Sequence, residues 1–180
     1  MRRVYLFTAT AALALVLTSG AALAATIHCS GGECFGTGEN DTLFGTAARD
    51  SIHGLGGDDD LGGGNSNDRL YGGPGDDFLG GDDGKDVLHG RGGDDSFNGG
   101  RGSDTIYGGD GSDFMVTPSA GDGDDRVFGG KGNDFLSVYS DNPENDVDFL
   151  DCGPGNRDTG IINEGVDTVR NCEILSFEED

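Results

Sequence analysis

The chain has 180 residues, of which 36 are glycine, 34 are acidic and only 11 are basic, so its formal net charge is −23. A chain of this length is expected to form a single domain, and so negative a charge excludes nucleic acid as a direct partner. The composition is typical either of a disordered acidic linker or of a repeat array that neutralises its own charge.

The first 24 residues have the features of a secretion signal rather than of a folded segment. Arg2 and Arg3 provide a positive start, and a mostly apolar run, 4–17, follows them. Ala22-Leu23-Ala24 then offers the small-x-small pattern of a cleavage site, which predicts Ala25 as the mature N-terminus. An uncleaved membrane anchor and export by the twin-arginine route are the alternatives. The sequence therefore predicts an extracellular protein, whose net charge becomes −25 once the two arginines are removed.

Four cysteines remain after cleavage, and they frame the rest of the chain. They are Cys29, Cys34, Cys152 and Cys172. An even number of cysteines behind a secretion signal predicts disulfide bonds. Three pairings exist, and pairing each cysteine with its nearest neighbour gives Cys29–Cys34 in an N-terminal cap (25–35) and Cys152–Cys172 near the C-terminus. The second bond would close a loop of about 20 residues and contribute on the order of 3 kcal/mol. A Cys₄ metal site is disfavoured because no Cys-x₂-Cys pair occurs.

A nine-residue repeat occupies residues 36–137. In nine consecutive copies a glycine stands at the first position, an aspartate at the sixth and an apolar side chain at the eighth. After a slip at 117–119, the aspartate and the apolar residue return in two more copies. The apolar residues are Leu43, Ile52, Leu61, Leu70, Leu79, Leu88, Phe97, Ile106, Met115, Val127 and Leu136. The aspartates, which are the candidate metal ligands, are Asp41, Asp50, Asp59, Asp68, Asp77, Asp86, Asp95, Asp104, Asp113, Asp125 and Asp134.

The best copies resemble a known repeat family. Residues 72–80, Gly-Gly-Pro-Gly-Asp-Asp-Phe-Leu-Gly, resemble the repeats-in-toxin (RTX, hemolysin-type) calcium-binding nonapeptide, Gly-Gly-x-Gly-x-Asp-x-apolar-x. The resemblance implies an all-β fold, a right-handed parallel β-roll that forms as a solenoid around bound Ca²⁺. Early copies lack the expected glycine at the second and fourth positions, where they have Thr37, Thr46 and Leu55, and Glu39, Ala48 and Ser66. We expect those turns to be less regular and the outer sites to be weaker.

The residue types of the repeat suit this chemistry. Glycine lets the backbone adopt positive φ and turn its carbonyls toward a cation, and Ca²⁺ takes six to eight oxygen ligands from carbonyls and carboxylates. The end of each copy is predicted to form a short strand of three residues, whose middle side chain points inward. One turn and one strand make half a coil, so a full coil takes two copies of the repeat. The aspartates then stack in two columns, Asp41, Asp59, Asp77, Asp95 and Asp113 along one edge and Asp50, Asp68, Asp86 and Asp104 along the other.

Stacked aspartates require a counter-ion. Neighbouring strands lie about 4.8 Å apart, and two charges at that distance repel by about 1 kcal/mol in water and by several-fold more near protein. A divalent ion in each gap removes the repulsion. One column has four gaps and the other has three, so we expect about seven Ca²⁺ ions in the unbroken array. We expect the metal-free chain to be a disordered acidic polymer.

The repeat weakens after residue 137, and residues 138–180 are predicted to form a degenerate repeat followed by a C-terminal cap. Residues 148–158 still echo the repeat, with Cys152 in a glycine position. Solenoids need an atypical end that covers the last coil, and the apolar residues gathered between Ile161 and Leu175 suit that role. The segments 152–155 and 171–173 resemble the tail of small secreted calcium-binding repeat proteins.

Nothing in the sequence predicts catalysis. The chain contains neither His-Glu-x-x-His nor Gly-x-Ser-x-Gly, and His53 and His89 fall at the outward ninth position of their copies. We expect a secreted calcium-binding protein that is not an enzyme. The alternative is a calcium-stiffened adhesin or extracellular-matrix scaffold with a cell-surface or polysaccharide partner. An accessory module of a polysaccharide-acting enzyme and an ice-binding protein are less favoured.

Overall fold

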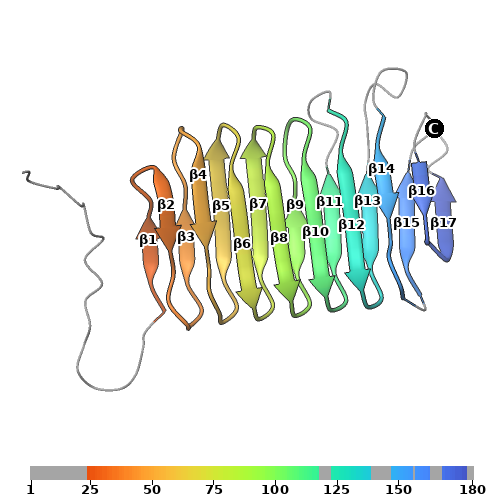
Figure 1. Ribbon diagram of the computed structural model, residues 1–180, viewed down its shortest axis with the longest axis horizontal. Coiled ribbons are helices and arrows are strands. Elements are labelled where there is room, and N and C mark those ends of the chain that lie inside the picture. Colours follow the sequence, from red (N-terminus) through yellow and green to blue (C-terminus); the bar gives the residue numbers. More distant parts are fainter. Residues whose placement is uncertain (1–23, 118–122, 139–146, 156, 163–167, 178–180) are drawn as a thin grey trace, which may run out of the picture.

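The chain forms an elongated stack of β-strands that runs along one axis (Figure 1). The structure is a computed structural model that describes residues 24–117, 123–138, 147–155, 157–162 and 168–177. The predicted secretion signal lies outside these residues, apart from Ala24. Within the described segments, no helix has the length and apolar character needed to cross a membrane.

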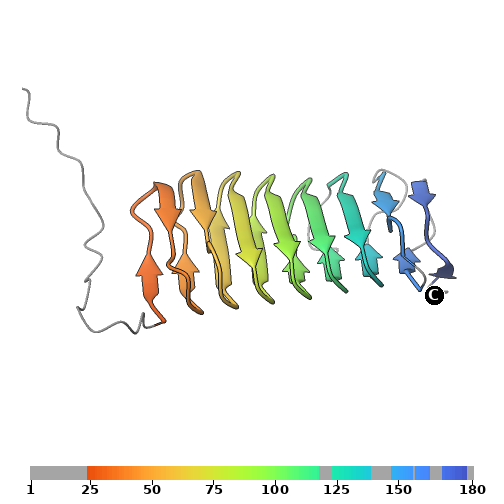
Figure 2. The same ribbon diagram turned by 60° about the horizontal axis from the view of Figure 1, so that its bottom comes forward.

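The described residues contain seventeen strands in two parallel sheets. The odd-numbered strands form a nine-stranded sheet in the order β1 (Thr26–His28), β3 (Thr42–Phe44), β5 (Asp60–Asn65), β7 (Phe78–Asp83), β9 (Ser96–Asn98), β11 (Phe114–Thr117), β13 (Phe135–Val138), β15 (Thr159–Ile162) and β17 (Ile174–Phe177). The even-numbered strands form an eight-stranded sheet in the order β2 (Gly32–Phe35), β4 (Asp50–His53), β6 (Arg69–Pro74), β8 (Val87–Gly92), β10 (Thr105–Asp110), β12 (Arg126–Lys131), β14 (Phe149–Asp151) and β16 (Thr168–Arg170). The chain alternates between the sheets at every strand, so the fold is a β-solenoid, as predicted (Figure 2).

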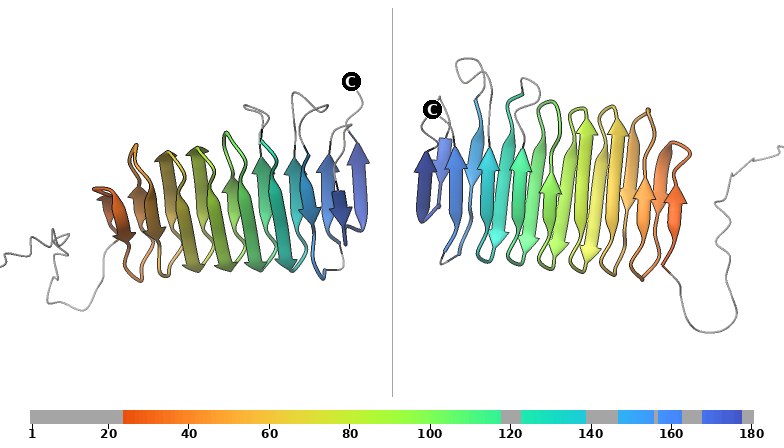
Figure 3. Two further views of the ribbon diagram at one scale, coloured as in Figure 1. Left: turned by 45° about the horizontal axis from the view of Figure 1, so that its top comes forward. Right: turned by 180° about the vertical axis from the view of Figure 1, so that it is seen from behind.

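The register between coils follows the predicted spacing of two copies per coil. Leu61 in β5 pairs with Leu79 in β7, and Leu70 in β6 pairs with Leu88 in β8. After the slip, Ile106 in β10 pairs with Val127 in β12, so the coil that contains the slip is longer than those before it. The sheets therefore continue through the irregular part of the sequence, and the view from behind in Figure 3 shows the strands still stacked there.

Several strands are longer than predicted. Strands β5, β6, β7, β8, β10 and β12 each have six residues, because they extend into the glycine-rich turn that follows. The backbone of one turn hydrogen-bonds with that of the next coil, as in Gly75 N to Gly92 O (2.9 Å) and Gly93 N to Asp110 O (2.9 Å). The glycine-rich turns of successive coils thus stack on one another, as the strands do.

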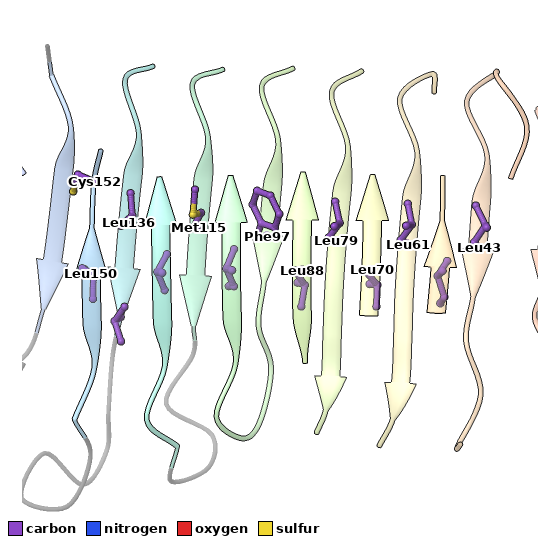
Figure 4. Packing of buried hydrophobic residues seen from close by; sticks show 14 of the residues in the cluster. Leu43, Leu61, Leu70, Leu79, Leu88, Phe97, Met115, Leu136, Leu150 and Cys152 are labelled. Carbon is purple, nitrogen blue, oxygen red and sulfur yellow. The ribbon is translucent and has the colours of Figure 1, made fainter. Parts of the chain in front are cut away.

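The core consists of two rows of side chains, one from each sheet, that fill the space between the sheets. The middle residue of each repeat strand is buried, from Leu43 to Leu136, and Leu150 continues the row in β14 (Figure 4). This narrow core explains why one apolar position per copy suffices in the sequence. The disulfides Cys29–Cys34 and Cys152–Cys172 are present, with Cα–Cα distances of 5.6 and 5.1 Å, as the nearest-neighbour pairing predicts.

The turn conformation persists where glycine is missing. Leu55, Ser66, Asp82 and Arg91 have φ between 70 and 87°, although each carries a Cβ atom. This left-handed conformation costs roughly 1 kcal/mol for a non-glycine residue. The hydrogen bonds between stacked turns therefore impose the turn shape on these residues. Thr37 and Thr46, which also replace glycine, do not take positive φ, and their turns differ in structure.

Candidate metal centre

All eleven aspartates at the sixth position of the repeat are buried in the solenoid. Asp125 has the highest exposed fraction, 8 %, and the others are at 3 % or less. Each stands two positions before the inward apolar side chain of its copy. Because odd and even copies face opposite edges of the solenoid, the carboxylates form two columns. The predicted columns are thus present, and both continue past the slip.

One carboxylate oxygen of each of these aspartates, except Asp50, joins successive coils. Asp59 Oδ1 accepts a hydrogen bond from the backbone N–H of Asp41 (2.7 Å), and Asp77 Oδ1 accepts one from Asp59 N–H (2.8 Å). The same bond recurs down both columns, as far as Asp134 Oδ1 and its donor Asp113 N–H (2.9 Å). Each such carboxylate therefore reaches back toward the preceding coil and lies in the gap between two turns.

The second oxygen of most of these carboxylates has no partner. Among the described residues, Oδ2 is buried without a hydrogen bond in seven aspartates of the unbroken array and in two beyond it: Asp59, Asp68, Asp77, Asp86, Asp95, Asp104, Asp113, Asp134 and Asp158. A buried polar atom without a partner costs roughly 1–3 kcal/mol, and more if it is charged. These oxygens recur at the repeat period, and they are therefore the candidate positions for a bound cation.

Glycine at the first position of each copy makes room for this carboxylate. A Cβ atom built on Gly63 would lie 2.7 Å from Gly81 O in the next coil and 2.9 Å from Asp68 Oδ2. A Cβ atom on Gly36 would likewise lie 2.5 Å from Gly54 O and 2.9 Å from Asp41 Oδ2. Neither glycine has positive φ, so space and not backbone conformation requires glycine there. The space is bordered by a carboxylate oxygen and a backbone carbonyl oxygen.

Burial makes the ionised carboxylates unfavourable in the metal-free solenoid. Desolvation is the main cause that raises the pKa of Asp86, Asp95 and Asp113 to about 7, and that of Asp104 to about 8. The backbone hydrogen bond to each carboxylate opposes the shift, and the neighbouring aspartates of the same column add to it. Protons or a cation must therefore neutralise the columns when the chain is folded.

Two aspartates that sequence reasoning did not select belong to the same columns. Asp148 Oδ1 accepts a hydrogen bond from Asp125 N–H (2.8 Å), and Asp158 Oδ1 accepts one from Asp134 N–H (2.9 Å). Both are buried, with exposed fractions of 1 % and 0 %. The signal for Asp148 was the apolar Leu150 two positions later, whereas Asp158 is followed at that distance by Gly160.

The residues fit Ca²⁺ better than a softer metal. Among the described residues, no three or more His, Cys, Asp or Glu side chains gather as a metal-binding group. The candidate ligands of a gap are therefore a carboxylate and backbone carbonyls, such as Asp68 and Gly81 O. An all-oxygen set of this kind suits a hard cation that accepts many ligands in flexible geometry, which is the preference of Ca²⁺.

The two repeat histidines belong to a structural row on the outer face of the eight-stranded sheet. Six rings stack there with centroids 4.7–5.1 Å apart: Phe35, His53, Tyr71, His89, Tyr107 and Phe128. Partial burial in this row lowers the pKa of His53 and His89, and Arg91 contributes further. Stacked rings contribute about 0.5–1.5 kcal/mol per pair, so both histidines have a structural role that needs no catalytic explanation.

Acid is expected to replace calcium partly in stabilising the fold. The folded pKa values of about 6–8 lie above the ordinary 3.8, so between these limits the folded chain binds more protons than the unfolded chain. The stability of the metal-free fold must then fall as pH rises through this window. In metal-free buffer we expect circular dichroism to report more β-structure at pH 5.5 than at pH 8. Equal spectra at both pH values would contradict the cost that we assign to ionised carboxylates buried in the columns.

Comparison with known families agrees with this geometry. The family model of the RTX calcium-binding nonapeptide repeat matches residues 35–70, 61–88, 80–115 and 119–142, which together make up more than half of the chain. The matched region ends before Asp148 and Asp158. No curated protein matches the chain.

Proposed function

The chain belongs to the RTX calcium-binding nonapeptide repeat family, and from this we propose that it is a secreted protein that folds by binding several Ca²⁺ ions between successive turns. The ions would lie in the gaps of the two aspartate columns. The protein would then act as a structural calcium-binding module, without a catalytic role of its own.

The observation that carries this proposal is the row of unpartnered Oδ2 atoms. A buried carboxylate oxygen without a partner is costly in a protein interior, and the cost is greatest when the carboxylate is charged. Here it recurs once per gap, beside a glycine that leaves room for it. A divalent cation supplies what every one of these gaps lacks, since it pairs with Oδ2 and offsets the repulsion along the column.

The number of ions follows from the number of such oxygens. Seven aspartates of the unbroken array have an unpartnered Oδ2, which equals the number of gaps counted from the sequence. Asp134 and Asp158 add two more candidate gaps beyond the slip. We therefore propose at least seven ions, held by the carboxylates and by carbonyls of the glycine turns.

The proposed site of action is extracellular. The predicted secretion signal and the two disulfides both suit an oxidising compartment outside the cytosol. Calcium is abundant there, so sites in the range of about 10⁻⁴–10⁻³ M would suffice. The acidic chain would remain unfolded during export, where calcium is scarce, and would fold after release.

A calcium titration of the mature chain tests the proposal. With residues 25–180 purified and both disulfides intact, we expect a cooperative increase of β-structure by circular dichroism in the submillimolar to millimolar range. Mg²⁺ serves as the control ion, and it should be far less effective because it requires a small octahedral shell and keeps its waters. Native mass spectrometry of the folded form should count at least seven Ca²⁺. A chain that is already β-rich in chelator and insensitive to calcium would overturn the proposal.

A further inference from the structure

In the first two turns of the array, the aspartate carboxylate has hydrogen-bond donors that are missing in later turns. Copies 36–44 and 45–53 have threonine at the second position, where later copies mostly have glycine. Asp41 Oδ2 accepts hydrogen bonds from the backbone N–H (2.5 Å) and the hydroxyl (2.8 Å) of Thr37. Asp50 Oδ2 accepts the same two bonds from Thr46, at 2.7 and 2.8 Å. The oxygen that lacks a partner in Asp59 thus has two donors here.

The same two turns depart from the repeat at a second position. Both copies also lack glycine at the fourth position, where Glu39 and Ala48 stand. Glu39 N–H donates to the Thr37 hydroxyl oxygen (3.2 Å), and Ala48 N–H donates to that of Thr46 (3.1 Å). In each turn the threonine hydroxyl accepts a hydrogen bond from the residue two positions later and donates one to the aspartate. Hydrogen bonds within the chain therefore close the turn. Positive φ is then unnecessary at either position, and none is found there.

The position of these turns explains why they differ. Asp41 Oδ1 accepts a hydrogen bond from Ala25 N–H (2.6 Å), so its carboxylate faces the segment that precedes the first repeat. That segment contains the Cys29–Cys34 disulfide and no aspartate. It therefore adds no further aspartate to the column, and the next member lies in the coil that follows, at Asp59. At this end of its column the Asp41 carboxylate is satisfied by donors of its own turn.

We propose that Thr37 and Thr46 end the calcium array at its N-terminal side by taking the place of an ion, so that calcium binding begins at Asp59 and Asp68. The inference rests on the proposed function, since it assigns which carboxylates hold ions. Hydrogen bonds to the ionised form stabilise a carboxylate without metal. The Asp41 turn is the fuller case, because Asp50 still has an unpartnered Oδ1.

Ion counting in matched variants tests this assignment. By native mass spectrometry at saturating calcium, Asp41→Asn is expected to retain the wild-type number of ions and the wild-type calcium midpoint. Asp59→Asn, one coil further, is expected to lose at least one ion and to require more calcium. Loss of an ion in Asp41→Asn would overturn the assignment, and loss in Asp50→Asn would overturn it for that edge. If no variant, wild type included, bound calcium, the proposed function would be the statement that fails.

The threonine hydroxyl has its own test. Thr37→Val removes the hydroxyl but preserves the shape of the side chain, and it should lower the thermal midpoint of the calcium-bound protein without changing the ion number. Thr42→Val is the control, because Thr42 lies in β3 and its hydroxyl takes part in none of these bonds. Equal midpoints for the two variants would contradict the closing role of Thr37.

Discussion

Replacing Gly63 by alanine is expected to raise the calcium concentration needed for folding about tenfold, which corresponds to ~1.4 kcal/mol. The added Cβ would lie 2.7 Å from Gly81 O and 2.9 Å from Asp68 Oδ2. Both distances are too short for a methyl group, so the carboxylate and the carbonyl would be pushed apart. These are the two oxygens that we assign to one calcium gap, and the loss should fall on that gap.

The neighbouring residue provides a matched control for this prediction. Gly62 lies in the same strand, β5 (Asp60–Asn65), and its added Cβ would have nothing nearer than the Phe44 ring at 3.8 Å. Neither glycine has positive φ. Gly62→Ala should therefore leave the calcium midpoint unchanged, or lower it slightly because alanine restricts the unfolded chain. A calcium titration of both variants decides the matter. Equal midpoints would show that the space at Gly63 is not part of a calcium site.

Replacing Asp95 by asparagine is expected to have opposite effects with and without calcium. Asp95 lies in the middle of its column, with its Oδ1 bound to Asp77 N–H (2.8 Å) and its Oδ2 unpartnered. Burial, with the charges of Asp113 and Asp77 adding to it, raises the pKa of Asp95 to about 7. At pH 8 the carboxylate is charged, so a neutral amide of the same shape removes repulsion in the metal-free fold. The same change removes a charged ligand from the calcium-bound fold.

Two titrations measure these effects. In chelator at pH 8, Asp95→Asn should retain more β-structure than the wild type by circular dichroism. With calcium it should bind at least one ion fewer and show a midpoint about tenfold higher. The control is Asp94→Asn, which removes the same charge from an exposed neighbour whose Oδ1 accepts a bond from Ser112 N–H (2.7 Å). If Asp94→Asn gave the same shifts, net charge rather than the buried column would govern calcium affinity.

Much of the fold could be predicted because the repeat is local and strict. The period of the repeat indicated half a coil, and the structure pairs positions two copies apart throughout the unbroken array, as with Leu61 and Leu79. The inward apolar residue and the nearest-neighbour disulfides were also predicted correctly. Each of these features follows from chemistry within one copy or between adjacent cysteines.

The aspartates beyond the slip were harder to recognise. The separations in sequence from Asp134 to Asp148, and from Asp148 to Asp158, are not multiples of the repeat length, so a search with a strict period loses both. The structure places them in the columns through bonds from Asp125 N–H and Asp134 N–H. Insertions in the turns change the spacing in sequence but not the stacking of strands, and only the stacking decides which carboxylates meet.

The sequence by itself determined the coil length, the side chain that faces the core and the aspartates of the unbroken columns, because each depends on a pattern that recurs within one copy. Only the tertiary structure decided how each carboxylate is satisfied. The bond from Asp41 N–H to Asp59 Oδ1 joins residues in different coils, and the ring row of His53 and Tyr71 forms across them as well. The sequence predicted less regular turns at the threonines 37 and 46, yet in the structure these side chains close their turns. Whether a buried oxygen has a donor depends on what the adjacent coil places beside it, and that arrangement exists only once the coils are stacked.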